Sequence, residues 1–330
     1  MRIAVLGGGS WGTALAIHAA RLHPDVVLWM RNPEVAEQYA RERRNARYLP
    51  DLQFPDGLRV SADPAVIDER DLVLVAVPSG AFRETLRWVA PRLGDQAVVA
   101  WATKGLETTT GAWLHEIAAE ELGPAQPPAL VSGPSFAAEV AREQPTALTA
   151  ASTDPARTEC LQRALHGRSM RIYRNTDVLG VELGGALKNV LAVATGIADG
   201  AGFGANARAA LITRGLAEIQ RLGAAVGARP TTLTGLSGLG DLVLTCTDDH
   251  SRNRRLGLQL GQGVDLDTAR ARIGQSVEGV ETARVAVARA AQAGVEMPIC
   301  AEVHAVLYQG RPVHEAVRRL LERDPTAEDL

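Results

Sequence analysis

The N-terminal stretch constrains the fold of this chain more than any other part of the sequence. Residues 2–6, RIAVL, form a short apolar run that leads directly into the glycine-rich segment 7–12, GGGSWG. A helix-forming sequence, TALAIHAARL, follows at residues 13–22. A strand, a Gly-x-Gly-x-x-Gly turn and a helix in this order are typical of the first βα unit of a Rossmann-type fold. The sequence therefore predicts an α/β domain that starts here.

Each glycine of this turn has a separate physical task. Gly7 permits the tight turn, Gly9 lets a pyrophosphate approach the backbone, and Gly12 lets the helix pack against the strand. The N-terminus of the following helix then offers unpaired N–H groups and the positive end of the helix dipole to the phosphates. We therefore predict dinucleotide binding at this turn. The alternative is a glycine-rich turn that binds no ligand.

The second predicted strand, residues 25–30, bears on the choice between NAD and NADP. An NAD-selective site would place an acidic residue for the ribose 2′-hydroxyl at its end, but the sequence has Arg31 there. An arginine suits a 2′-phosphate, so we favour NADP over NAD; the alternative is a solvated loop charge. The basic run 41–47 lacks interleaved aromatic residues, so we interpret it as a solvated helix face and expect no nucleic-acid binding.

Further apolar runs predict a mostly parallel, doubly wound sheet. Continuous apolar strands of this kind are buried on both faces of a sheet. Ligands of such sheets lie beyond the carboxyl ends of the strands, which is where Lys104 and the turn 133–137, GPSFA, fall. The predicted strands are 59–61, 72–77, 97–102, 130–132, 147–151 and 170–173.

After residue 177 the pattern becomes helical. A chain of 330 residues is too long for one ordinary core, so we divide it into a Rossmann-type domain, residues 1–178, and an all-α domain, residues 179–330. The predicted helices are 181–199, 206–225 with Asn206 as the cap and Gly227 beyond the end, 278–293, 299–309 and 313–323, with Gly294 and Gly310 as terminators.

The helix at 181–199 has an unusual face. Small residues, including Gly184, Gly185 and Gly196, surround a single lysine, Lys188. A glycine inside a helix costs about 1 kcal/mol relative to alanine, so we expect a compensating close approach of another backbone or a ligand, with Lys188 projecting into that contact. The alternative is ordinary helix packing, with Lys188 extending to solvent.

A reaction with a nicotinamide cofactor also needs a group that donates or accepts the proton of the alcohol. Lys188 is our candidate for that group. Beside glycines in a buried site, its pKa should fall toward neutrality, which would let it protonate a carbonyl oxygen. Asp241, at the end of the glycine-rich turn 235–240, could hold that ammonium group. Residues 251–255, SRNRR, form a compact set suited to an oxyanion; the alternative is a solvated helix start.

Composition excludes several other classes. The net charge of −3 gives no general attraction to nucleic acid or anionic membranes, and we expect no apolar run long enough to span a membrane. The sequence opens on a strand rather than a signal peptide, and its three scattered cysteines indicate a reducing compartment, so we expect a cytoplasmic protein. We interpret Cys246 as a buried thiol and expect no metal site, with Asp248, Asp249 and His250 capping a loop.

Seven motifs together resemble the bacterial NAD(P)-dependent glycerol-3-phosphate dehydrogenases. They occur in the expected order through nearly the whole chain: GGGSWGTALA (7–16), WATKGLE (101–107), SGPSFAAEVA (132–141), VELGGALKNV (181–190), GLGDLVLTCT (238–247), SRNRRLG (251–257) and VEG (277–279). The resemblance implies reversible reduction of dihydroxyacetone phosphate to sn-glycerol 3-phosphate, feeding phospholipid synthesis. It implies NADP or NAD as cofactor and a triose phosphate as substrate.

The resemblance also implies roles for individual residues. Lys188 would be the proton donor and acceptor, with Asp241 beside it. The substrate would be contacted by Lys104, Gly133, Ser135, Lys188, Asp241, Ser251, Arg252 and Asn253. The dinucleotide would be lined by Gly7, Gly9, Ser10, Trp11, Gly12, Arg31, Tyr48, Lys104, Ala137, Arg252, Ser276 and Glu278. Ser276 stands where the family usually has an apolar residue, and residues 30–32 lie in a variable stretch.

Two other functions stay open at this point. A dehydrogenase of the β-hydroxyacid or 6-phosphogluconate type shares the dinucleotide fold and a lysine–asparagine pair like Lys188-Asn189, but would act on a carboxylate. The 251–253 set and the loop before Asp241 favour a phosphate instead. A cofactor-sensing module without catalysis would not need both Lys188 and Asp241. We also expect that the chain can form a homodimer through its helical domain.

Overall fold

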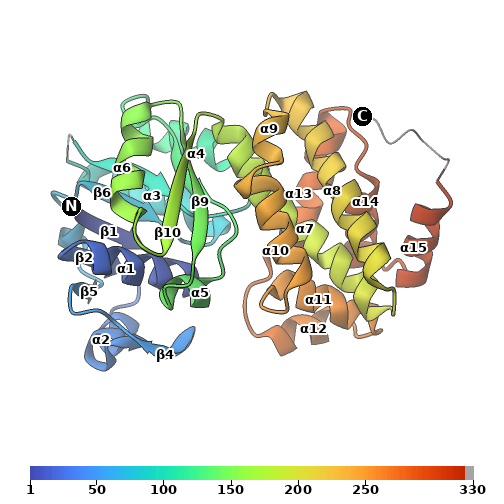
Figure 1. Cartoon of the computed structure of the whole chain (residues 1–330), viewed down its shortest axis with the longest axis horizontal. Helices are drawn as coiled ribbons and strands as arrows, with labels where there is room; N and C mark the ends of the chain where they lie inside the picture. Colours follow the sequence, from blue (N-terminus) through green and yellow to red (C-terminus); the bar gives the residue numbers. More distant parts are fainter. Residues whose placement is uncertain (95, 324–330) are drawn as a thin grey trace. The chain divides into compact units, whose positions relative to one another are not determined.

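The computed structural model describes residues 1–94 and 96–323, and it divides into two compact units (Figure 1). The first unit contains Met1–Glu107 and Ala112–Val178. The second contains Thr108–Gly111 together with the chain from Leu179 onward. In that unit Arg284 and Arg289 of one helix donate hydrogen bonds to the carbonyl oxygens of Thr108 and Gly111. The predicted division at residue 178 placed Thr108–Gly111 in the first domain, whereas in the structure this segment belongs to the second unit.

An eight-stranded sheet forms the centre of the first unit, in the order β10-β9-β8-β7-β6-β1-β2-β5. Neighbouring strands are parallel except for β8 and β9, so β9 and β10 run opposite to the others. The predicted mostly parallel α/β domain is confirmed. The strands are β1 Arg2–Leu6, β2 Asp25–Trp29, β5 Leu58–Ser61, β6 Leu72–Val75, β7 Val98–Trp101, β8 Ala129–Ser132, β9 Thr146–Ser152 and β10 Met170–Asn175.

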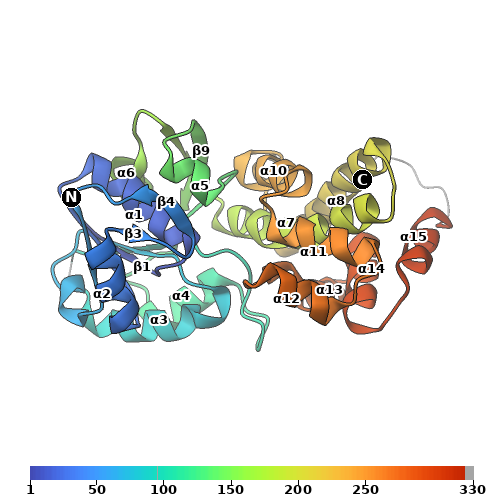
Figure 2. The ribbon, with the colours of Figure 1, turned by 90° about the horizontal axis from the view of Figure 1, so that it is seen from below.

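Helices cover both faces of this sheet, which explains the continuous apolar runs of its central strands. Helix α1 (Ser10–Leu22) packs against α5 (Ala137–Ala141) and α6 (Pro155–Leu165), whereas α3 (Phe82–Val89) packs against α4 (Leu114–Leu122). Figure 2 shows α1 and α6 on one side of the sheet and α3 and α4 on the other. Short 3₁₀ turns occur at Pro64–Ile67, Ser79–Ala81 and Ala90–Arg92.

The basic run 41–47 is not the helix face that we predicted. Helix α2 (Pro33–Glu42) ends within the run, and Arg43 adopts a left-handed conformation with φ 51°. The chain then forms an antiparallel hairpin of β3 (Arg44–Asn45) and β4 (Leu49–Gln53). A positive φ stops a helix because the next residue can no longer continue the hydrogen-bond pattern. A pattern of charges alone does not reveal this left-handed turn.

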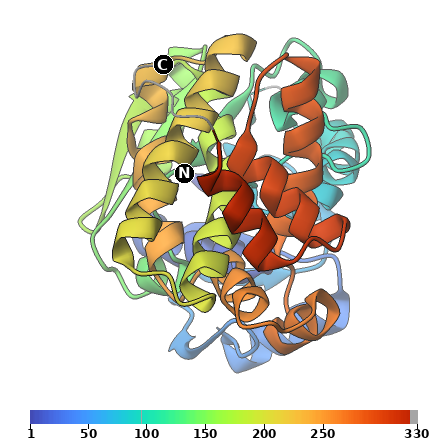
Figure 3. The same ribbon diagram turned by 90° about the vertical axis from the view of Figure 1, so that its right-hand side faces the viewer.

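The regular elements in the described part of the second unit are helices, as predicted (Figure 3). Figure 3 shows the red helices near the C-terminus beside the yellow-green ones, in agreement with the contact between α14 and α8. A π-helical turn at Leu236–Gly240 precedes α10. The helices are α7 Val178–Gly200, α8 Ala205–Val226, α9 Pro230–Leu233, α10 Asp241–Thr247, α11 Arg252–Gly261, α12 Leu266–Ile273, α13 Glu278–Gln292, α14 Pro298–Tyr308 and α15 Val313–Leu321.

Most predicted helix ends hold, with one exception. Gly227, Gly294 and Gly310 follow α8, α13 and α14 with φ between 65° and 93°, the left-handed region that favours glycine. Asn206, however, is not a cap. Helix α8 begins at Ala205, and its N-cap is Gly204, which makes no side-chain cap. Asn206 therefore lies inside the first turn.

Helix α7 is the core helix of the second unit. By length and composition alone it could cross a membrane, so the expectation that no apolar run is long enough was wrong. Yet 94% of its most apolar window is buried inside the protein. Its apolar sequence therefore serves the core of a globular unit.

Helices α7 and α11 cross in backbone contact, which accounts for Gly196 and Gly200 of α7. A Cβ on Gly196 would lie 2.1 Å from the carbonyl oxygen of Arg254, and one on Gly200 would lie 2.1 Å from that of Leu258. From the other side, a Cβ on Gly257 would lie 2.1 Å from the carbonyl oxygen of Val193. No side chain fits at these positions. The predicted close approach of another backbone is therefore confirmed.

Candidate active site

The glycine turn of the first unit has the geometry predicted for Gly7 and Gly12. Gly7 has φ +122°, and its N–H donates to the carbonyl oxygen of Trp29 at 3.0 Å, so the turn is tied to β2. A Cβ on Gly12 would lie 2.1 Å from the carbonyl oxygen of Gly7, so only glycine lets α1 pack this closely against the turn.

Gly9 differs from its neighbours because the space beside it is open. It is the N-cap of α1, and a Cβ placed on it would meet nothing within 4 Å. No side chain caps this end of α1, so the N–H groups that begin at Ser10 and Trp11 keep their hydrogen-bonding capacity for a ligand. An anion such as a pyrophosphate fits these properties: accessible backbone, unpaired donors and a positive helix end.

The residues expected at the adenosine end lie on two segments near the turn. Arg31 is exposed, and the next residue, Asn32, caps α2 by accepting from the Val35 N–H at 3.1 Å. Tyr48 is half-buried in the β3–β4 hairpin, with the guanidinium of Arg47 5.2 Å from its ring centroid. The sequence analysis named Arg31 and Tyr48 but did not predict the hairpin on which Tyr48 lies.

Three of the expected substrate residues meet at the carboxyl ends of β7 and β8. Nζ of Lys104 donates to the carbonyl oxygen of Gly133 at 3.2 Å, and the hydroxyl of Ser135 donates to the same oxygen at 3.0 Å. Gly133 has φ +146°, so it turns the chain sharply before α5. Ala137 then starts α5 with its side chain half-buried.

In the second unit, Lys188 and Asp241 form a buried ion pair. Nζ of Lys188 donates to Oδ1 of Asp241 at 2.5 Å and to the hydroxyl of Thr245 at 3.0 Å. The Lys188 residue is 8% exposed and Asp241 is fully buried, so the alternative in which Lys188 extends to solvent is wrong. The hydroxyl of Thr245 in turn donates to the Asp241 carbonyl oxygen at 2.6 Å. Sequence reasoning missed Thr245.

Two glycines bring this ion pair together. A Cβ on Gly184 of α7 would lie 2.4 Å from the carbonyl oxygen of Ser237, and one on Gly238 would lie 1.9 Å from that of Leu233. The π-helical turn can therefore lie directly on α7, and Asp241 follows at the first position of α10. Here glycine serves helix packing, and the packing delivers the carboxylate to the lysine.

The basic run 251–255 separates into residues with different tasks. Ser251 is the N-cap of α11, and its hydroxyl accepts from the Arg254 N–H at 3.2 Å. Arg254 is buried and paired with the carboxylates of Asp199 and Asp249, so its charge is already balanced. Arg252 is half-buried on the first turn, whereas Arg255 is exposed. Of the three arginines, Arg252 is the one that stays a candidate for binding an oxyanion, together with Ser251 and Asn253.

Asn253 belongs to a side-chain network that links α7, α11 and α13. Its Nδ2 donates to Oδ1 of Asn189 at 2.9 Å, and its Oδ1 accepts from the Gly279 N–H at 2.8 Å. Nδ2 of Asn189 donates to Glu278 at 3.2 Å. The network thus connects the neighbour of Lys188 with an expected substrate residue and an expected cofactor residue. Ser276, by contrast, is exposed before α13.

The loop after Asp241 follows expectation. Cys246 is fully buried, and burial raises the pKa of its thiol to about 12, so it is not a nucleophile. The carboxylate of Asp248 accepts from the N–H and from Nδ1 of His250, and these hydrogen bonds, the backbone one first, lower its pKa. Asp249 pairs with Arg254.

One sequence signal for the two lysines was overlooked. Lys104 and Lys188 are the only lysines in the chain, whose 35 Lys and Arg residues are otherwise all arginines. Arginine stays charged at any physiological pH, so it cannot exchange a proton as an ammonium group can. Lys104 and Lys188 therefore differ from the other basic residues in this one respect: their ammonium groups can exchange a proton.

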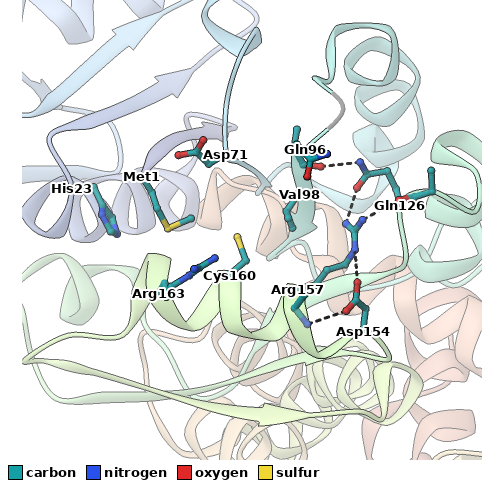
Figure 4. Close-up of a pocket in the computed structure, with 13 residues that line it drawn as sticks. Met1, His23, Asp71, Gln96, Val98, Gln126, Asp154, Arg157, Cys160 and Arg163 are labelled. Carbon is teal, nitrogen blue, oxygen red and sulfur yellow. Dashed lines mark hydrogen bonds and ion pairs between the residues drawn. The ribbon is translucent and has the colours of Figure 1, made fainter.

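A cavity of 670 Å³ lies at the opposite, amino-terminal edge of the sheet (Figure 4). Its buried cation is already engaged: Arg157 donates to Oε1 of Gln126 at 2.7 Å and to the Ala125 carbonyl oxygen at 3.1 Å. Asp154 accepts from the Ala156 N–H in the first turn of α6. Nε of Arg157 makes no hydrogen bond, but it lies 3.6 Å from the Asp154 carboxylate, so the charge of the arginine is balanced and we assign the cavity no part in the chemistry. Its other lining residues are Met1, His23, Asp71, Gln96, Ala97, Val98, Cys160 and Arg163.

Comparison with known families gives a consistent result over both units. The family model described as NAD-dependent glycerol-3-phosphate dehydrogenase N-terminus matches residues 2–158. The model described as the C-terminus of the same enzyme matches residues 177–318. These two ranges cover most of the chain.

Individual relatives match along nearly their whole length. A protein of Thioalkalivibrio sulfidiphilus named glycerol-3-phosphate dehydrogenase (NAD(P)+) is 61% identical, over 99% of this chain and 98% of its own. One of the same name from Methylococcus capsulatus is 54% identical, with the same coverage. The crystal structure of glycerol-3-phosphate dehydrogenase from Coxiella burnetii has 47% sequence identity and a TM-score of 0.94, over 98% of this chain and 99% of that one.

Proposed function

The chain belongs to the NAD-dependent glycerol-3-phosphate dehydrogenase family, and on that premise we propose that it reduces dihydroxyacetone phosphate reversibly to sn-glycerol 3-phosphate with NADPH or NADH. The observation that carries the proposal is the buried cluster of Lys188, Asp241 and Thr245. A ketone that accepts a hydride also needs a proton at its oxygen, and a positioned ammonium group can donate one.

We assign the proton transfer to Lys188. When bound, the nicotinamide cofactor supplies the hydride to carbon 2 of the substrate, or accepts it in the reverse direction. Nζ of Lys188 donates its proton to the carbonyl oxygen, which becomes the hydroxyl oxygen, and takes that proton back in the reverse reaction. The Asp241 carboxylate at 2.5 Å and the Thr245 hydroxyl at 3.0 Å hold the ammonium group in one orientation.

We propose that the N-terminus of α11 receives the substrate phosphate. A phosphate monoester carries about −1.5 to −2 charges near neutral pH, and Arg252 together with the free N–H groups of the first helical turn complements that charge. Ser251 and Asn253 keep this turn in place through the cap and the Asn189 network. In the first unit, Lys104, Gly133 and Ser135 are the further residues that we propose for substrate contact.

The glycine turn is the proposed site for the dinucleotide pyrophosphate. The open space beside Gly9 and the uncapped start of α1 at Ser10 and Trp11 support this assignment. Exposed Arg31 suits a 2′-phosphate, so we propose a preference for NADPH over NADH. The other proposed cofactor contacts are Tyr48, Lys104, Ala137, Arg252, Ser276 and Glu278.

We also propose a cytoplasmic homodimer whose product enters phospholipid synthesis. The three cysteines, Cys160, Cys246 and Cys300, are buried free thiols, which suits a reducing compartment. Light scattering coupled to size exclusion measures the mass in solution and decides between monomer and dimer.

The test of the activity follows NADPH or NADH absorbance at 340 nm with dihydroxyacetone phosphate. We expect turnover by the wild type and a 10²–10⁴-fold lower kcat for Lys188→Ala, with an unchanged Kd for the cofactor. Lys188→Arg keeps the charge but cannot release a proton, so it should be similarly inactive. Arg255→Gln, at an exposed position of the same basic run, serves as the control with normal activity.

Two results would overturn the proposal. A wild type that is inactive on the phosphorylated ketone but active on a β-hydroxyacid would make the chain a carboxylate dehydrogenase. If Lys188→Ala retained near-wild-type kcat, the proton would come from another group. Because the chain has only two lysines, ¹⁵N-lysine labelling also gives two side-chain signals, and a Lys104→Arg variant identifies the one from Lys188, whose pKa can then be measured directly.

A further inference from the structure

Asn45 is a fully buried polar residue that neither the motifs nor the proposed chemistry explains. It ends the short strand β3, between exposed Arg44 and half-buried Ala46. A buried side-chain amide is retained only when its donors and acceptor find partners, since an unsatisfied buried polar group costs about 1–3 kcal/mol. The partners of Asn45 therefore indicate its task.

Those partners lie on the glycine turn, on α1 and on the hairpin. Nδ2 of Asn45 donates to the hydroxyl oxygen of Thr13 at 2.8 Å and to the carbonyl oxygen of Gly8 at 3.2 Å. Its Oδ1 accepts from the Tyr48 N–H at 3.1 Å. One amide thus joins three segments, and it uses both N–H donors and the carbonyl acceptor. Aspartate has the same shape but lacks the two donors.

The contact with Gly8 fixes a peptide plane. In a planar trans peptide, the carbonyl oxygen of one residue and the N–H of the next point in opposite directions. With the Gly8 carbonyl oxygen held by Asn45, the Gly9 N–H must point away from the hairpin. Gly9 is the glycine of the turn beside which the space is open. Asn45 thereby controls the direction of a backbone donor at the proposed pyrophosphate site.

The contact with Thr13 fixes the helix that follows. Thr13 is fully buried, and its N–H donates to the Gly9 carbonyl oxygen at 3.0 Å, which closes the first turn of α1. Because Asn45 binds Gly8 and Thr13 together, it ties the turn and the start of α1 into one rigid unit. The same side chain holds the backbone at Tyr48, the hairpin residue that we propose as a cofactor contact.

We propose that Asn45 is a positioning residue for the dinucleotide: it aligns the Gly8–Gly9 peptide, the start of α1 and Tyr48 into one binding surface. This inference rests on the proposed use of NADPH or NADH. It predicts an effect on cofactor affinity that is separate from the proton transfer at Lys188.

The experiment compares Asn45→Ala with Gln126→Ala. Gln126 is a matched control because its side-chain amide also makes three hydrogen bonds, to Val99, Ala97 and Arg157, but at the opposite edge of the same sheet. Kd for NADPH is measured by fluorescence titration well below the Tm of each variant, and kcat and both KM values are measured at 340 nm.

For Asn45→Ala we expect Kd and KM for NADPH to rise about 10–100-fold, while kcat at saturating cofactor and KM for dihydroxyacetone phosphate stay within about threefold. Gln126→Ala should lower Tm and leave Kd unchanged. Equal Kd values for the wild type and Asn45→Ala would overturn the inference, as would an equal rise in Kd for both variants. If the wild type bound neither NADPH nor NADH, the proposed function itself would fail instead.

Two further variants keep the test decisive if Asn45→Ala does not fold. Asn45→Asp keeps the shape and the acceptor for Tyr48 but loses the donors to Gly8 and Thr13, so Kd should rise. Thr13→Val removes only one of the three contacts and should raise Kd less, while Thr13→Ser, which keeps the hydroxyl, should restore it. Wild-type affinity in both Asn45→Asp and Thr13→Val would contradict the inference.

Discussion

The glycine turn of the first unit and the crossing of α7 and α11 in the second both depend on glycine, but for different reasons. Beside Gly9 a side chain would meet nothing within 4 Å, so the absent Cβ leaves the backbone accessible. At Gly257 a Cβ would lie 2.1 Å from the carbonyl oxygen of Val193, so the absent Cβ lets two helices touch. The first arrangement presents backbone N–H groups, and the second brings together helices that carry buried side chains such as Asn189 and Asn253.

The two regions also differ in the range of their interactions. The glycines and backbone N–H groups of the turn lie within residues 7–12, because the strand, the glycines and the start of α1 are consecutive, although Trp29 and Asn45 hold the turn from outside. Lys188 and Asp241 are 53 residues apart, and Asn189 and Glu278 are 89 residues apart. The groups of a backbone site can therefore come from one short motif, whereas those of a side-chain site come from distant segments that helix packing brings together. Three substitutions test this contrast.

The largest expected effect is that of Gly257→Ala on stability. Its Cβ would collide with the backbone of α7, which cannot move aside as a flexible side chain can, so we expect a loss of at least about 3 kcal/mol in the free energy of unfolding. Urea denaturation measures it. Gly204→Ala, at an open position with φ −84°, is the control and should cost no more than about 1 kcal/mol. Equal losses would show that the crossing is not tightly packed.

The second effect concerns Glu218, a buried acid of the same unit that takes no part in the proposed chemistry. Its carboxylate accepts from the N–H groups of Ile299 at 2.6 Å and Cys300 at 3.2 Å, at the start of α14. Burial nevertheless raises its pKa from 4.5 to about 7. A raised pKa means that folding favours the protonated form. The stabilisation is complete below pH 4.5 and is lost as the pH rises to about 7, by about 3 kcal/mol in total.

The measurement is the free energy of unfolding from pH 4.5 to 8 for the wild type and Glu218→Gln. The glutamine variant does not titrate, so the difference between the two proteins should change by about 3 kcal/mol across this range. Parallel pH profiles would show that Glu218 has an ordinary pKa in the folded protein. Burial in the second unit would then not shift the pKa of this side chain as we infer.

Gly9→Ala should have the smallest effect on stability, but it should weaken cofactor binding directly. Its Cβ has room in the protein, so stability should change by no more than about 1 kcal/mol, while Kd for NADPH should rise about 10-fold or more because the methyl group occupies the path of the pyrophosphate. Gly12→Ala should show the reverse order of effects, since its Cβ would lie 2.1 Å from the Gly7 carbonyl oxygen. If Gly9→Ala bound NADPH normally, the phosphate site would lie elsewhere.

The sequence by itself determined the class of the fold and most of its elements. Apolar runs predicted the sheet, and the spacing of Gly7, Gly9 and Gly12 predicted the turn, because these features depend on residues that are close in the chain. The glycines after α8, α13 and α14 marked helix ends for the same reason. Lys188 and Asp241 could be named as candidates, and the family motifs paired them, but no periodicity or spacing gave their distance.

Only the tertiary structure decided which side chains work together. It divided the basic run into Arg252 on the helix start, Arg254 balanced by Asp199 and Asp249, and exposed Arg255, a distinction that rests on burial and not on residue type. It turned part of the predicted helix face into the hairpin that buries Asn45. The physical reason is the same in both cases: a charge or an amide is satisfied by partners that the fold brings from distant segments, and chain order does not record those partners.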